Sequence, residues 1–130
     1  MTVHEKFDSG LEVSVAAAFD VLAWEIELAG ARCIFLDTII GELMETMPEA
    51  QRARLLEGMH GVDLLGQHLT GLSAFARRMS QNAPAEVLTP VQVALDDITL
   101  GALADRMTTA FGGVEKGVND GDDAGDLDLF

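Results

Sequence analysis

The sequence predicts an all-α protein built on a long antiparallel helix hairpin, and three observations lead to this fold class. Apolar residues recur at steps of three and four through two stretches of about 35 residues each. Pro48 stands between the two stretches, where it ends one helix and begins the next. The apolar fraction is 48%, yet the chain has one Trp, no Tyr and six Phe. The core therefore relies on aliphatic side chains, which suits helix packing.

The first helix is expected from about residue 11 to 46, after a loose arm at residues 1–9. Its Ala, Leu and Glu content favours helix. Residues 33–40 have the propensity of a strand, but no hairpin partner or turn pattern accompanies them, so a helix is predicted there too. Apolar residues on other sides of this helix indicate neighbours on more than one side. The main apolar stripe consists of Val15, Phe19, Leu22, Ile26, Ala29, Cys33 and Leu36.

The second helix is expected from about residue 48 to 81. Each glycine inside it costs up to about 1 kcal/mol relative to Ala. Two explanations are open: tight packing within a bundle, which we favour, or the close approach of a partner. The glycines are Gly58, Gly61, Gly66 and Gly71. The predicted inner stripe consists of Leu55, Met59, Val62, Gly66, Leu69, Leu72, Ala76 and Met79.

A third helix is predicted at residues 90–111, with Thr89 as N-cap and Pro90 in the first turn. Asp97 or Thr99 is expected to break it, with Thr99 capping a second segment. From residue 112 the chain is rich in Gly and Asp, which predicts disorder. The predicted organisation is a flexible arm at 1–9, a helical bundle domain at 10–111, and a flexible acidic linker and terminal binding tail at 112–130.

Two helices of this length span about 50 Å at 1.5 Å per residue. Such a pair cannot bury wide apolar surfaces alone, and the third helix is too short to cover them. We therefore expect a homodimer that forms a four-helix bundle.

The charge balance narrows the range of partners. The chain has 22 acidic against 8 basic residues and a net charge of −14, which suits neither nucleic acid nor an anionic membrane. A protein partner with a basic rim fits better.

Cys33 is the single cysteine and is expected to be a buried small hydrophobe. A single cysteine excludes a disulfide framework, so a reducing cytoplasm is the expected compartment. No signal peptide is visible, and no apolar run approaches the ~20 residues of a membrane span.

Motifs for metal binding and nucleophilic catalysis are missing from the sequence. His60 and His68 are eight residues apart, about 12 Å along a helix, which is too far for a shared ion. No zinc, calcium, phosphate-loop or serine-nucleophile signature occurs. We expect no metal site and no cofactor in this chain.

One polar face of the second helix carries the main functional hypothesis. His60, Asp63, Gln67 and Thr70 recur at steps of three and four and share this face. The simplest interpretation is a solvated surface. The alternative is a site in which a carboxylate and an amide, one helical turn apart, act together.

The segment Asp63-Leu64-Leu65-Gly66-Gln67 resembles the Asp-Leu-Thr-Gly-Gln signature of the CheZ family of chemotaxis phosphatases. In that family the signature lies on the second helix of a long hairpin, and two hairpins pair into a four-helix bundle. The family chain also ends in an acidic linker and a short tail finishing in Phe, to which Gly125–Phe130 is similar. Leu65 departs from the signature's Thr, the chain is short for the family, and the third helix has no counterpart there.

The resemblance implies an activity: dephosphorylation of a phospho-aspartyl response regulator of the CheY type in two-component signalling. Gln67 matches the residue that orients the attacking water, and Asp63 matches the residue that contacts a receiver lysine. Mg²⁺ is expected in the partner receiver, not in this chain. The terminal residues that the resemblance assigns to receiver binding are Asp126, Leu127, Asp128, Leu129 and Phe130. The alternative for this tail is a solubilising acidic end.

Two other functions stay open at this point. A non-catalytic helical adaptor or scaffold protein keeps the bundle but has no use for Gln67. A histidine phosphotransfer module needs an exposed His; His60 and His68 are candidates, but neither has the Lys and Gly neighbours expected there.

Overall fold

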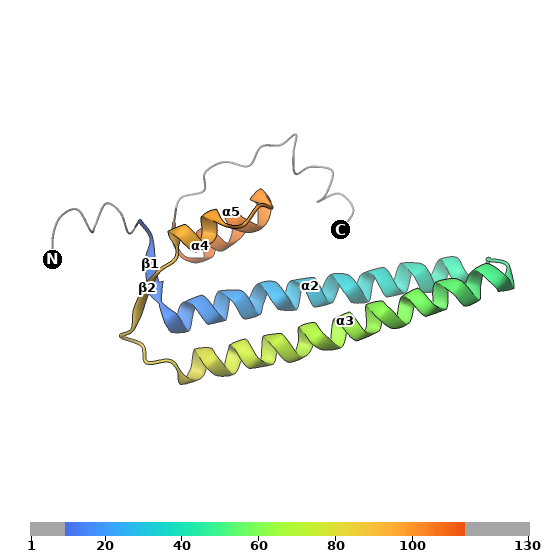
Figure 1. Cartoon of the computed structure of the whole chain (residues 1–130), viewed down its shortest axis with the longest axis horizontal. Coiled ribbons are helices and arrows are strands. Elements are labelled where there is room, and N and C mark those ends of the chain that lie inside the picture. Colours follow the sequence, from blue (N-terminus) through green and yellow to red (C-terminus); the bar gives the residue numbers. More distant parts are fainter. Residues whose placement is uncertain (1–9, 114–130) are drawn as a thin grey trace. The chain divides into compact units, whose positions relative to one another are not determined.

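The computed structural model describes residues 10–113. It confirms a mostly helical chain with a long antiparallel hairpin and short helices (Figure 1). Two short strands that the sequence did not predict are added to this plan. The arm expected at residues 1–9 and the tail expected beyond residue 113 lie outside the described residues. In chain order the elements are β1 (Glu12–Ser14), α2 (Val15–Met44), α3 (Glu49–Asn82), β2 (Leu88–Pro90), α4 (Gln92–Asp96) and α5 (Gly101–Ala110).

The two long helices begin and end at clear local signals. The backbone N–H of Ala17 donates to Ser14 Oγ at 3.0 Å, which caps the first turn of α2. A short turn after Met44 leads to Pro48, whose carbonyl accepts the N–H of Arg52 at 2.9 Å. Glu49 places an acid in the first turn of α3, where it complements the helix dipole. The first helix starts four residues later than predicted, because residues 12–14 pair as a strand.

The described residues divide into two compact units. We call Leu22–Arg77 the hairpin unit. The strand unit comprises residues 10–21 together with residues 78–113.

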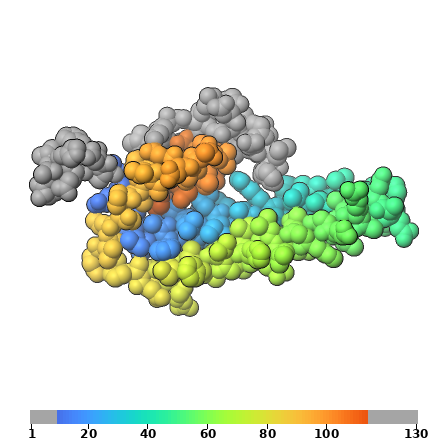
Figure 2. All heavy atoms as spheres, viewed as in Figure 1, coloured from blue at the N-terminus to red at the C-terminus, as the bar shows by residue number. Residues whose placement is uncertain are grey.

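Small side chains form the seam of the hairpin unit. Its buried residues are Ala23, Ser73 and Ala76, with exposed fractions of 0, 7 and 2%. The side chains of α2 and α3 meet along this unit (Figure 2). Leu72, predicted to point inward, is 53% exposed, and the next residue, Ser73, is buried in its place. Neighbouring residues of a helix point about 100° apart, so the side chain of α3 that turns toward the seam here is Ser73 and not Leu72.

The strand unit is fastened by backbone pairing. β1 and β2 form an antiparallel pair in the register Glu12↔Pro90, Val13↔Thr89 and Ser14↔Leu88. Further backbone bonds lie at both ends of the ladder, from Val15 to Val87 and from Val91 to Leu11, each 2.9 Å. The buried apolar residues of this unit are Val91, Leu95 and Ala102.

The predicted third helix is two helices. α4 ends at Asp96 and α5 begins at Gly101, so a break falls in the region predicted from Asp97 and Thr99. Thr99 does not cap the second segment, because Leu100 occupies the N-cap position without a side-chain cap bond. Thr89 and Pro90 belong to β2 instead of the helix start, since their backbone pairs with β1. Among the described residues, no helix is long and apolar enough to cross a membrane.

Candidate functional site

Asp63 and Gln67 are both exposed on α3 within the hairpin unit. Both line one open groove of about 780 Å³ that runs along this unit. The groove has an apolar floor and polar residues from both helices. Its apolar members include Ile26, Ala31, Ile34, Val62 and Leu69, and its polar members are Glu27, Cys33, Asp37, Asp63, Gln67, Thr70 and Ser73.

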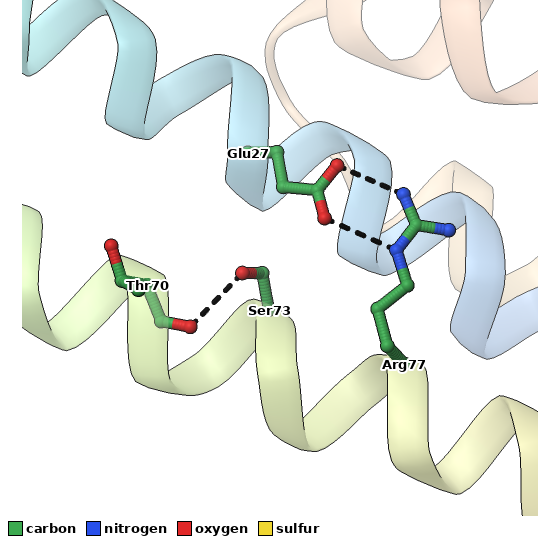
Figure 3. Close-up of polar contacts among 4 residues, drawn as sticks. All are labelled: Glu27, Thr70, Ser73 and Arg77. Carbon is green, nitrogen blue, oxygen red and sulfur yellow. Dashed lines mark hydrogen bonds and ion pairs between the residues drawn. The ribbon is translucent and has the colours of Figure 1, made fainter.

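The continuous helix α3 sets the spacing of its groove residues. Asp63, Gln67 and Thr70 are separated by four and three positions, so they face the same side. Thr70 Oγ1 donates to the carbonyl of Gly66 at 3.0 Å, and Ser73 Oγ donates to the carbonyl of Thr70 at 3.0 Å (Figure 3). These two hydroxyls are therefore occupied by their own helix. Within residues 10–113, no side chain binds the Gln67 amide, which stays available to a ligand.

Gly66 leaves room beside the amide. A Cβ atom built at this position meets nothing within 4 Å, and the same holds for Gly58, Gly61 and Gly71. Packing inside the described chain therefore does not account for these four glycines. The open space leaves both explanations in place: packing against a second chain in the expected four-helix bundle, or the close approach of another partner.

Asp37 of α2 enters the groove opposite Asp63, and it is not among the site residues predicted from the sequence. Its Oδ1 atom is fully buried and has no hydrogen-bond partner in the described part of the chain when both carboxyls are ionised, because two carboxylates have no hydrogen to share. A hydrogen bond to Asp63, then burial, and then the negative charge of Asp63 raise the pKa of the Asp37 carboxyl. When it is protonated, the Asp37 carboxyl can donate the missing bond to Asp63.

The sequence does hold a signal for Asp37. It is an acid four residues after Cys33, on the otherwise apolar inner stripe of the first helix.

An ion pair joins the two helices near one end of the groove. Arg77 of α3 donates from Nη2 to Glu27 Oε1 at 2.8 Å and from Nε to Glu27 Oε2 at 3.1 Å (Figure 3). This bidentate bond lowers the pKa of Glu27, against a smaller opposing effect of burial. Both side chains are more than a third exposed. Solvent therefore weakens the pair, and its contribution to the stability of the fold is small.

Other candidates from the sequence lie elsewhere. His60 and His68 are exposed on α3, and neither lines the groove. Cys33, expected to be buried, is half-buried and lines the groove as a free thiol. Within residues 10–113, no group of three or more His, Cys, Asp or Glu side chains can hold a metal ion. The proposed receiver-binding residues Asp126, Leu127, Asp128, Leu129 and Phe130 lie outside the described residues.

The fold and the groove define a helical-hairpin protein with a carboxylate pair and a free amide on one open face. The chain belongs to the family described as a domain of unknown function, DUF8776, whose model matches residues 12–130. No curated protein and no solved structure matches the chain. The family match covers both units, and it assigns no activity to either.

Proposed function

We propose that this protein accelerates the dephosphorylation of a phospho-aspartyl response regulator of the CheY type, with Gln67 holding the attacking water. One observation carries the proposal: Asp63 and Gln67, one helical turn apart, are exposed in the same open groove. The free space at Gly66 lets a partner surface come close to both. The resemblance of residues 63–67 to the CheZ signature supplies the reaction class.

In this reaction the Gln67 side chain has to position the water and does not have to act as a base. Water attacks the phosphorus, the bond between phosphorus and the aspartyl oxygen breaks, and inorganic phosphate leaves. Such a transfer needs an in-line nucleophile and neutralised charge more than a strong base. An amide both donates and accepts hydrogen bonds and does not titrate, so Gln67 can hold the water at any physiological pH. The receiver supplies the Mg²⁺.

Asp63 has a separate task in this proposal. Its exposed carboxylate accepts a hydrogen bond from a lysine of the receiver and fixes the orientation of the docked receiver. The net charge of −14 favours encounter with a basic rim on the receiver. The terminal segment, with Leu127, Leu129 and Phe130 as anchors and Asp126 and Asp128 toward that rim, holds a receiver near the groove and raises its local concentration.

A homodimer completes the proposed assembly. Leu65 and Leu72 each follow a groove residue, Asp63 and Thr70, by two positions, which turns them about 200° away from the groove. They are 48 and 53% exposed. A second hairpin packed on this side forms a four-helix bundle and leaves both grooves open. We propose a reducing cytoplasm as the compartment, in keeping with the free thiol of Cys33.

The test follows phosphate release from a receiver labelled on its aspartate. We expect the full chain to accelerate release and Gln67→Ala to lose about a hundredfold of that acceleration, because the water is no longer held. Binding to a receiver activated with beryllium fluoride should survive in the variant. His60→Ala is the matched control, since His60 shares the helix and is exposed but does not line the groove. Unchanged acceleration in Gln67→Ala removes the amide from the mechanism.

A second candidate function is a non-catalytic adaptor, and one observation favours it. Trp24 and Phe35 are 54 and 53% exposed on α2, and the phosphatase proposal gives them no role. Large exposed aromatic side chains are common anchors of protein interfaces. Receiver binding with no acceleration of phosphate release by the wild-type chain selects the adaptor.

A further inference from the structure

We propose that Asp37 is a positioning residue of this site: across the hairpin it fixes the Asp63 carboxylate beside Gln67. The inference rests on the proposed function, because it assigns Asp37 a role in the same groove. It adds a residue from the other helix, so that the site belongs to the hairpin and not to α3 alone.

The geometry comes from both helices. Asp37 on α2 and Asp63 on α3 line the same groove, with Gln67 one turn further along α3. Asp37 Oδ1 has no exposed surface and no hydrogen-bond partner within the described residues. A buried oxygen without a partner is costly, whereas a proton shared with Asp63 satisfies both groups. Asp37 then donates from its O–H to Asp63 and holds that side chain where the receiver lysine docks.

No other charged group of the groove binds the pair of Asp37 and Asp63 within the described residues. Among the residues that line the groove, the other titratable groups are Glu27 and Cys33, both from α2. Glu27 is occupied by Arg77. From α3, Asp63 is the titratable group in the groove. When Asp37 loses its proton, two carboxylates face each other and Asp63 is driven out of position, so the site weakens as the pH rises.

The experiment uses phosphate release from a labelled receiver, with the full chain and variants of both acids. Asp37→Ala should lower the acceleration roughly tenfold, because Asp63 is no longer held. Asp37→Asn should stay within about twofold of the wild type, since its amide always donates, and should remove the loss of activity toward higher pH. In an Asp63→Ala background, Asp37→Ala should cause no further loss.

Two results overturn the inference. The first is an equal loss from Asp37→Ala with and without Asp63, which makes its effect independent of that residue. The second is a pH profile of Asp37→Asn identical to that of the wild type. Helix content by circular dichroism shows whether each variant is folded, and the conservative Asp37→Asn keeps the test decisive where Asp37→Ala unfolds.

A second measurement needs no receiver and separates this inference from the proposed function. Carbon NMR of the aspartate carboxyls in the full chain should show Asp37 titrating above the ordinary range, and Asp63→Ala should bring it back toward that range. No change in Asp63→Ala contradicts the link between the two acids. Wild-type protein that accelerates nothing, with this titration shift intact, overturns the phosphatase proposal and the role of Asp37 in it, but leaves the carboxyl pair established.

Discussion

The hairpin unit and the strand unit bury their side chains in opposite ways. Among the described residues, twelve exposed large apolar side chains lie in the hairpin unit and four in the strand unit. The hairpin unit buries small residues, such as Ala23 and Ala76, while the strand unit buries Leu95 and Val91. The hairpin unit buries none of its large apolar side chains, whereas the strand unit buries two of them.

This difference indicates two kinds of structure in one chain. The strand unit has a small apolar core and a two-stranded backbone ladder. The hairpin unit buries small side chains only, and twelve of its large apolar side chains are exposed. An apolar exposure of this extent on a helix pair is typical of an interface. The groove with Asp63 and Gln67 lies on this unit, which is the surface that the proposed function assigns to the receiver.

The largest effect is expected from charging the side of the hairpin unit that faces away from the groove. Replacing both Leu65 and Leu72 with Glu should abolish dimer formation, because buried charges without partners oppose association. Sedimentation velocity of the full chain measures this. Val93→Glu is the control, since Val93 is 70% exposed in the strand unit. Dimers that persist in the double variant place the interface elsewhere.

The next effect concerns the core of the strand unit. Leu95→Ala should lower the free energy of unfolding by about 2–5 kcal/mol, because it removes a buried side chain and leaves a cavity. Val93→Ala on the same helix, α4, should change it by less than about 0.5 kcal/mol. Denaturation with urea compares the two. Equal losses contradict the assignment of Leu95 as core and Val93 as surface.

Glycine substitutions should have opposite signs in the two units. Gly58→Ala has open space in α3 and should stabilise the chain by up to about 1 kcal/mol. A Cβ at Gly113 lies 2.9 Å from Thr108 Cγ2 and 3.0 Å from Leu11 Cδ2, so Gly113→Ala should destabilise it. Thermal unfolding gives both signs.

Gly66→Ala tests function as well as stability. It should stabilise α3 as Gly58→Ala does, yet slow receiver dephosphorylation, because its methyl group enters the groove. Unimpaired activity shows that no partner comes close at Gly66.

The smallest effect is a dependence of stability on pH, with opposite signs at two carboxyls. The pKa of Glu27 is lowered below its ordinary value of 4.5, so its contribution to stability is present above that value and is lost as the pH falls below it. The pKa of Asp37 is raised above 3.8, so stability is lost as the pH rises from that value through the raised one. Glu27→Gln should flatten the acid side of a melting profile and Asp37→Asn the other side. A shift of the same sign in both variants contradicts the two assignments.

The sequence predicted the parts of the fold that depend on neighbouring residues. The two long helices follow from apolar steps of three and four, and the turn follows from Pro48. The interruption between α4 and α5 was predicted from Asp97 and Thr99. The exposure of Asp63 and Gln67 on one face is likewise a consequence of their spacing along one helix.

Contacts between distant segments were decided by the tertiary structure alone. The strands at residues 12–14 and 88–90 have three residues each and pair with each other across a long stretch of chain, so neither has a local pattern strong enough to predict. Ser73 is buried in place of Leu72 because of the way α3 is rotated against α2, which is a property of the helix pair and not of either sequence. Asp37 meets Asp63 for the same reason: helical periodicity orients a side chain on its own helix, but only the pairing of two helices determines what it faces.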